Sequence, residues 1–291
     1  MTGLVFPLSA PQRHRLPPFC AAHSRWVKML PVVDQQDLLA ILCGSLVGFI
    51  LGAIGGGGSI LAVPLLVYVV GVKSPHVAIG TSAVAVAVSA FANLIDHARR
   101  DHVCWPVAIL FAIAGVAGAA LGSTLGKHTD GQKLLILFGM LMVVVATSMA
   151  LKREGGSKPK VSLEAHNVPR VVGIGFVVGT LSGFFGIGGG FLVVPGLVAA
   201  TSMALIMAIG SSLVSVTAFG LTTAASYALS GLIDWRLVLL FVGGGIAGGL
   251  AGGRLATTLA PRKQALSLVF GVVIATVGVY VVVRGIMNLM E

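Results

Sequence analysis

The chain has 291 residues, of which 56% are hydrophobic, 10% are charged and 40 are glycine, and its mean hydropathy is +1.01. Soluble domains carry roughly a quarter charged residues and about 7% glycine, so this chain is too apolar to cover its own surface as a soluble globule. The hydrophobicity also excludes a disordered chain, and glycines without a three-residue period exclude collagen. The composition therefore predicts an all-α protein that crosses a membrane several times.

The net charge of +10 comes from 19 basic and 9 acidic residues. The basic residues lie in short clusters between apolar runs, where they orient a membrane protein and contact lipid headgroups. We therefore expect a lipid bilayer as partner and no nucleic acid. The three cysteines, Cys20, Cys43 and Cys104, are far apart, so neither a disulfide framework nor a metal site is expected. No cofactor is expected either.

Residues 1–37 are rich in proline and basic side chains and lack a sustained apolar run. They also lack the apolar region and cleavage site of a signal peptide. We expect a disordered extension here. Whether residues 1–28 belong to the natural protein stays open, because Met29 immediately precedes the membrane portion.

Stretches without Asp, Glu, Lys or Arg mark the expected membrane spans, since one crossing needs about 20 residues. Single crossings are predicted for 74–95, 102–126, 134–151, 237–253 and 264–283. The run 171–233 is long enough for two, divided near 200–203. The run 38–72 is too long for one span and too short for two with a turn.

The centre of 38–72 explains its odd length. Four consecutive glycines, followed by Ser59 and Pro64, cannot sustain a helix, since each costs about 1 kcal/mol relative to alanine. We expect either a broken helix or a re-entrant pair of half-helices. Inside a membrane such a break must be buried in protein or line a wet cavity.

The same pattern occurs twice. At an offset of 131, eight residues of the first half meet an identical residue in the second: Gly48, Gly52, Gly55, Gly57, Gly58, Leu61, Val63 and Pro64. At an offset of 130, Ile79–Ser82 align with Ile209–Ser212, and Trp105 aligns with Trp235. An ordered series of unlike residues indicates a duplication. It predicts two repeats, 38–151 and 171–285, joined by a polar linker at 152–170.

Each repeat is expected to hold four membrane elements with a glycine-broken first helix, giving about eight spans. An even number per repeat makes the repeats parallel; if the break counts as two crossings, the number is odd and they are inverted. The sequence leaves both open. With eight spans, residues 97–101 and the loop around Arg236 lie on the same side, and the positive-inside rule does not decide the orientation.

The paired breaks are the first candidate site, because a helix that starts inside the membrane presents free amides and a positive dipole end. Two such ends could form an anion cage. The candidate residues are Gly55, Gly56, Gly57, Gly58, Ser59, Gly186, Gly188, Gly189 and Gly190. The alternative, close helix packing, is favoured for Gly115, Gly118, Gly122, Gly245, Gly248 and Gly252.

Hydroxyl side chains follow each break at equivalent positions: Thr81, Ser82, Ser211 and Ser212. They could donate to anion oxygens, or they could bond back to a carbonyl of their own helix. No phosphate-binding loop follows the glycines. Neither Gly-x-Ser-x-Gly nor His-Glu-x-x-His occurs, and no acidic pair lies within an apolar run, so an enzyme is not expected.

The doubled pattern Gly-x-x-x-Gly-x-x-Gly-x-Gly-Gly, then Pro64 or Pro195, then Ile-Gly-Thr/Ser-Ser, resembles the TauE/SafE family across about residues 38–285. The resemblance implies about eight spans and ion-gradient-driven transport of sulfite or organosulfonates across a bacterial inner membrane. The repeats differ at Ser59, which aligns with Gly190, and at Gly56, which aligns with Ile187. Their two half-sites are therefore not identical.

The resulting hypothesis is a secondary transporter of small sulfur-containing oxyanions, working by alternating access around the two breaks. Its expected partners are a small anionic substrate, the bilayer and a coupling ion, either a proton or sodium. The alternative is an anion channel or a membrane assembly protein without a coupled cycle. Substrate, direction, orientation and oligomeric state stay open.

Overall fold

The computed structural model describes residues 34–54, 56–151, 167–258 and 263–290. Most of the predicted extension and linker, and Gly55, lie outside these ranges. The first half holds α2 (Gln35–Ile54), η1 (Gly56–Leu61), α3 (Ala62–Pro64), η2 (Leu65–Val69), α4 (Pro75–Arg99), α5 (Trp105–His128) and α6 (Gly131–Leu151). The second half holds α7 (Val168–Phe185), α8 (Gly190–Thr201), α9 (Leu205–Ala228), α10 (Trp235–Thr258) and α11 (Lys263–Met290).

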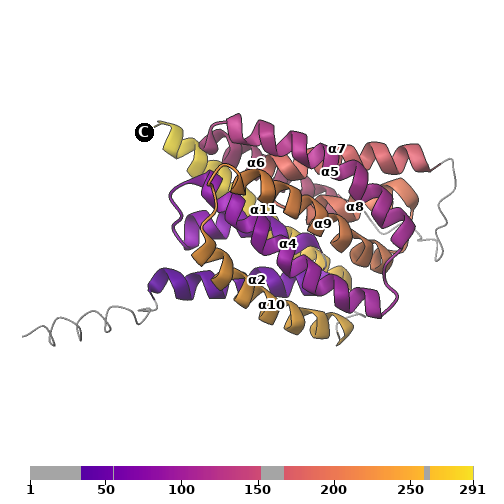
Figure 1. Ribbon diagram of the computed structural model, residues 1–291. Coiled ribbons are helices and arrows are strands. Elements are labelled where there is room, and N and C mark those ends of the chain that lie inside the picture. Colours follow the sequence, from indigo (N-terminus) through magenta and orange to yellow (C-terminus); the bar gives the residue numbers. More distant parts are fainter. Residues whose placement is uncertain (1–33, 55, 152–166, 259–262, 291) are drawn as a thin grey trace, which may run out of the picture. The chain divides into compact units, whose positions relative to one another are not determined.

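The described residues form helices joined by short turns, which confirms the all-α membrane architecture (Figure 1). Within these residues, 7 helices are long and apolar enough to cross a membrane. Shorter apolar helices cover 58–69, 131–147 and 190–201. The run 171–233 therefore holds a long helix, a short one and another long one, with the last boundary at 202–204 as expected.

Local chemistry explains where several helices begin. Proline occupies the first turn of α4, α5 and α7, where its missing amide proton costs nothing. The Asp130 carboxylate accepts hydrogen bonds from the amides of Gln132 and Lys133 at the start of α6. Asp234 does the same for Arg236 and Leu237 at the start of α10. These caps satisfy amides that have no partner inside the helix.

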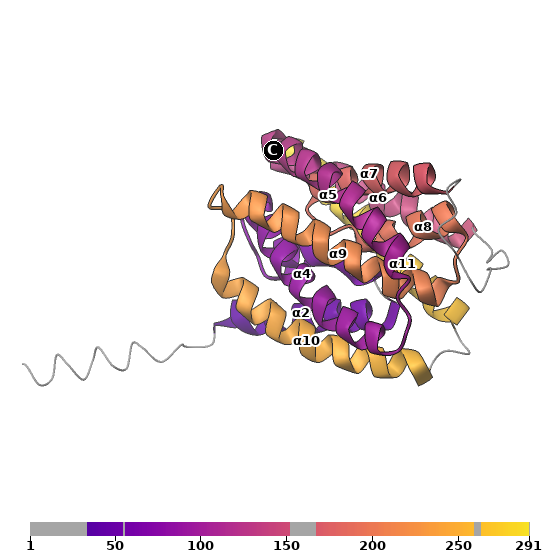
Figure 2. The same cartoon turned by 45° about the vertical axis from the view of Figure 1, so that its right-hand side comes forward.

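The first helix of each half packs lengthwise against the third long helix of the other half. These two pairs, α2 with α10 and α5 with α7, make the most extensive helix contacts in the described chain (Figures 1 and 2). Gly44 and Gly48 lie against Phe241 and Gly245 in the same chain order, so α2 and α10 run parallel.

The α5–α7 pair repeats this geometry. Gly118 lies against Phe176, and Gly122 against Thr180, so these two helices also run parallel. A side chain on these glycines would overlap backbone atoms of the partner helix. The prediction that Gly115, Gly118, Gly122, Gly248 and Gly252 serve helix packing is confirmed. Gly245 also lies at the α2–α10 contact, beside Ser89 of α4.

The two remaining pairs join equivalent helices of the two halves, and both run antiparallel. In the α4–α9 pair, Gly80 lies against Tyr227, and Ala87, further along α4, lies against Gly220, earlier in α9. In the α6–α11 pair, Ile136 lies against Gly285, and Gly139 against Gly278. Helices α4 and α6 of the first half therefore point opposite to their counterparts α9 and α11 in the second.

This antiparallel packing changes one expectation. Eight spans in two parallel repeats would put residues 97–101 and the loop around Arg236 on the same side. These segments instead follow the C-terminal ends of α4 and α9. Since α4 and α9 run in opposite directions, the two loops lie at opposite ends of the helix pair.

Candidate functional site

The second glycine break is a full reversal of the chain. Gly186 ends α7 in the left-handed conformation (φ 67°). Its amide donates to the Gly183 carbonyl, and the Ile187 amide donates to the backbone carbonyl of Ser182. Gly188 (φ 65°) and Gly189 (φ 70°) continue in the same left-handed region. Three left-handed residues in four positions explain the glycine run, because a β-carbon strains this conformation.

The short helix α8 then folds back along α7. Gly189, at its start, lies against Ser182, and Gly196, two turns later, lies against Val178 and Ile174. The two helices therefore run antiparallel, and α8 with its 12 residues covers about 18 Å, too short to cross a membrane. Of the two forms that the sequence allowed, the second break adopts the re-entrant one.

The first break has a different local conformation. Residues 56–61 form a 3-10 helix instead of an α-helical start, and a single α-helical turn and a short π-helix follow up to Val69. Gly58 is buried against the Val47 carbonyl and the backbone of Leu51. Ser59 is fully buried. The segment η1 packs directly against α8, so the two breaks lie side by side in the interior.

Two of the predicted hydroxyl ligands hold helix ends. The Thr81 hydroxyl oxygen accepts a hydrogen bond from the Asp234 amide (3.0 Å), and the Ser211 hydroxyl oxygen accepts one from the Cys104 amide (2.9 Å). Asp234 and Cys104 are the residues just before α10 and α5. Thr81 thus ties α4 to the start of α10 in the other half. Ser211 in the same way ties α9 to the start of α5.

The other two hydroxyls bond within their own helices. Ser82 donates to the Ile79 carbonyl (2.9 Å), and Ser212 donates to the Ile209 carbonyl (2.7 Å). This is the local alternative that the sequence left open. All four hydroxyl residues are fully buried, and each equivalent pair makes the same type of bond.

Sequence reasoning missed one polar residue beside the break. Ser182 of α7 is fully buried, and its hydroxyl has no hydrogen-bond partner among the described residues. A β-carbon on Gly189 would lie 2.6 Å from the Ser182 hydroxyl oxygen, so this hydroxyl directly faces the start of α8. The signal in the sequence is the alignment of Ser182 with Leu51 in an otherwise matching glycine pattern.

The polar residues in the last turns of α4 bond among themselves, away from the breaks. Asp96 and Arg100 form an exposed ion pair at 3.1 Å near the end of α4. Asn93 donates to the Ser89 carbonyl one turn earlier. Across the described ranges, no group of three or more His, Cys, Asp or Glu side chains is placed to hold a metal ion.

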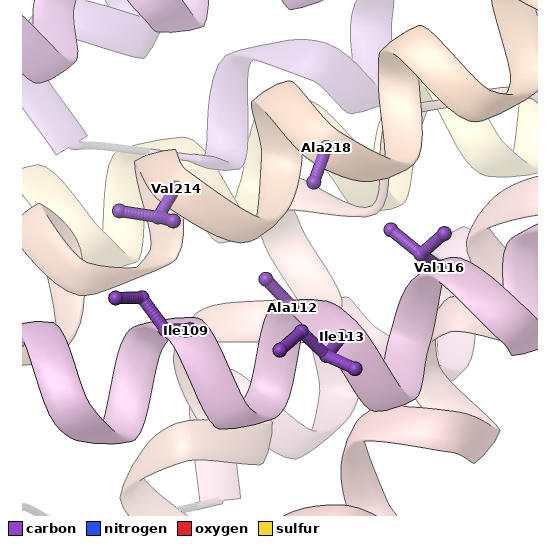
Figure 3. Close-up of a pocket in the computed structure, with 6 residues that line it drawn as sticks. All are labelled: Ile109, Ala112, Ile113, Val116, Val214 and Ala218. Carbon is purple, nitrogen blue, oxygen red and sulfur yellow. The ribbon is translucent and has the colours of Figure 1, made fainter.

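A groove between α5 and α9 lies on the outside of the helices and has a volume of about 340 Å³ (Figure 3). Its lining side chains are Ile109, Ala112, Ile113, Val116, Val214 and Ala218. None of them carries a polar atom, and Ile113 is 67% exposed. The groove therefore suits lipid chains, not an anion.

Comparison with known proteins gives a consistent result. The family model described as "Sulfite exporter TauE/SafE" matches residues 40–281. A "Probable membrane transporter protein" of Xylella fastidiosa (strain Temecula1 / ATCC 700964) is 49% identical over 255 residues, which covers 86% of this chain and 96% of the relative. The "Probable membrane transporter protein YunE" of Bacillus subtilis (strain 168) is 24% identical, covering 86% and 99%. No solved structure matches the chain.

The family match spans most of the chain and includes both glycine breaks and the four helix pairs described above. The membrane-spanning helices confirm an integral membrane protein, and the bacterial relatives agree with an inner-membrane location. The names of the relatives indicate a transporter rather than an enzyme. The chain therefore belongs to the TauE/SafE sulfite exporter family and is a membrane transporter.

Proposed function

We propose that this transporter is a secondary carrier of small sulfur-containing oxyanions, such as sulfite or organosulfonates, and that the two glycine breaks form its substrate site. The observation that carries the proposal is the packing of η1 against α8, which brings the two buried glycine breaks together between oppositely directed helices. The sulfur chemistry rests on the description of the matching family model.

The helix directions support two inverted repeats, 38–151 and 171–285. Counting the short segment after each break gives each half five elements, an odd number, and the antiparallel α4–α9 and α6–α11 pairs are what an odd number requires. Carriers built from inverted repeats place substrate at the repeat interface near the middle of the membrane, on discontinuous helices. The α8–η1 contact joins short, discontinuous helices from the two halves, as this arrangement requires.

The described chain is closed at the breaks. Val86 of α4 and Val216 of α9 approach the β-carbon position of Gly188 to 3.3 and 3.5 Å. Substrate entry therefore requires α4 of the first half to move away from α9 and the turn at residues 186–189 of the second half, first toward one side of the membrane and then toward the other. We assign this movement to alternating access of the two halves, driven by a proton or sodium gradient.

The proposed ligand groups are amides of Gly56, Gly57, Gly58, Ser59, Gly186, Gly188, Gly189 and Gly190. The hydroxyls of Thr81, Ser82, Ser211 and Ser212 are proposed as positioning groups, because their observed hydrogen bonds fix the helices around the breaks. This assignment replaces the direct ligand role expected from the sequence.

Counterflow in proteoliposomes tests the function. Vesicles loaded with unlabelled sulfite should transiently concentrate external radiolabelled sulfite, because a carrier exchanges substrate across the membrane. Empty vesicles and vesicles without protein are the controls. Labelled sulfite that only equilibrates, without an overshoot, would indicate a channel, and no protein-dependent flux of sulfite or organosulfonates would refute the substrate class.

A further inference from the structure

The two breaks do not offer an anion the same groups. At the second break, α8 begins at Gly190 as a regular α-helix, and no side chain caps its first turn. The amides of Leu192 and Val193 both donate to the Gly189 carbonyl. The amides of Gly190 and Phe191 precede them and have no acceptor inside the helix.

The second observation is independent of the helix end. Ser182 is fully buried, its hydroxyl has no partner among the described residues, and it faces Gly189. A buried hydroxyl without a partner costs free energy in the empty protein, so a ligand that accepts its hydrogen bond would be stabilised here. The hydroxyl of α7 thus lies against Gly189, the residue just before the free amides of α8.

The first break lacks this combination. Leu51 stands at the position that aligns with Ser182, and Gly58 packs on the backbone of Leu51 itself. The segment that follows is a 3-10 helix, which has three residues per turn and poorer hydrogen-bond geometry than an α-helix. The equivalent side chain is therefore apolar, and the equivalent helix start is irregular.

The charge around the second break favours an anion. Helices α7, α8 and α9 contain no Asp or Glu, so no carboxylate from these helices opposes a negative ligand. The break also meets the apolar side chains of Ile79, Val86 and Val216, so its polar groups for an anion are the amides and positive dipole end of α8 and the Ser182 hydroxyl. Backbone amides at a helix start are a general oxyanion-binding arrangement.

We infer that the oxyanion is held by one half of the pseudo-symmetric site only, through the first amides of α8 and the Ser182 hydroxyl. This inference rests on the proposed function, narrows its ligand amides to those of the second break, and adds one ligand residue and a stoichiometry. The half-site of the first repeat then closes over the substrate with Leu51 where the second repeat has Ser182. One oxyanion binds per chain, not two.

The test is equilibrium binding of radiolabelled sulfite to the purified full chain in nanodiscs, without oxygen. Ser182→Ala removes the donor, and its thermal stability should equal or exceed that of the wild type, because the hydroxyl makes no bond in the empty protein. Its sulfite affinity should fall about tenfold. The matched control is Ser123→Ala, a buried serine on α5 whose hydroxyl bonds to the Ala120 carbonyl, and its affinity should stay unchanged.

Each outcome is decisive. One sulfite per wild-type chain, with weakened binding only in Ser182→Ala, supports the inference. Equal affinity of Ser182→Ala and wild type, or two sulfites per chain, overturns it and leaves the proposed function standing. Absence of saturable sulfite binding by the wild type overturns the proposed function and, with it, this inference.

Discussion

The hydroxyl oxygen of Thr81 lies 3.0 Å from the backbone nitrogen of Asp234 and accepts its hydrogen bond. The pair Ser211 and Cys104 repeats this contact at an offset of 130 in both members. Exchanging the two halves converts one contact into the other, so the duplication seen in the sequence is also present in the structure. Each hydroxyl also caps the start of a helix in the opposite half: Thr81 caps α10, and Ser211 caps α5.

This capping role makes a stability prediction. Thr81→Val removes the acceptor and leaves the Asp234 amide without its partner, so the free energy of unfolding should fall by about 1–2 kcal/mol. Thr81→Ser keeps the oxygen and should stay near the wild type. Thermal unfolding of the purified protein in detergent measures the difference. Wild-type stability in Thr81→Val would show that the hydrogen bond contributes nothing.

The glycine contacts between α2 and α10 make a second prediction. A β-carbon on Gly48 would overlap the Gly245 carbonyl, whereas nothing lies within 4 Å of the β-carbon position of Gly243 on the same helix pair. Gly48→Ala should therefore lower the free energy of unfolding by about 1–3 kcal/mol. Gly243→Ala should be neutral or stabilising, by up to about 1 kcal/mol. Equal stabilities of the two variants would contradict the packing.

The inverted arrangement predicts that equivalent positions of the two repeats face opposite sides of the membrane. Arg99 and Leu229 are both exposed, near the C-terminal ends of α4 and α9. Single cysteines at these positions, in a chain without Cys20, Cys43 and Cys104, should react with a membrane-impermeant maleimide from opposite sides. Intact cells and inside-out vesicles provide the two sides. Labelling of both positions from the same side would indicate parallel repeats.

Alternating access predicts that a link between the halves stops transport. The β-carbon position of Gly220 on α9 lies 2.9 Å from the Ala87 β-carbon on α4, within reach of a disulfide after a small adjustment. The double variant Ala87→Cys with Gly220→Cys should lose flux on oxidation and regain it with dithiothreitol. Each single cysteine variant is the control. The substrate should be an organosulfonate, because sulfite itself cleaves disulfides. Full flux in the oxidised double variant would contradict alternating access by relative movement of the two halves.

The helices were predicted well from the sequence because each membrane span is a long run without charged residues. For example, the predicted span at 237–253 begins close to the first residue of α10, Trp235. The boundaries were less accurate where polar residues continue a helix past the apolar run. Helix α2 begins at Gln35 and α11 extends to Met290, since a charged residue at a membrane surface does not end a helix.

The site was predictable in part. The repeated glycines at 186–190 correctly marked a break, because three of them require left-handed conformations. The sequence could not tell a kink from a reversal, since both tolerate glycine. It also could not show that the Thr81 and Ser211 hydroxyls are engaged with Asp234 and Cys104, because those contacts join distant segments. Ser182 was missed although its mismatch with Leu51 is visible in the aligned repeats.

The most direct test of the central claim is sulfite counterflow by Gly188→Ala. The β-carbon position of Gly188 meets its neighbours at 3.3 Å or more, so alanine fits and the strain comes mainly from φ 65°. Such strain costs about 1–2 kcal/mol and leaves the chain folded. Relative to the amount of folded protein, flux should fall at least about tenfold, because the shifted amides lose their alignment with the oxyanion. The Gly243→Ala control should keep wild-type flux. Full sulfite flux in Gly188→Ala, or none in the wild type, would contradict a substrate site at the glycine breaks.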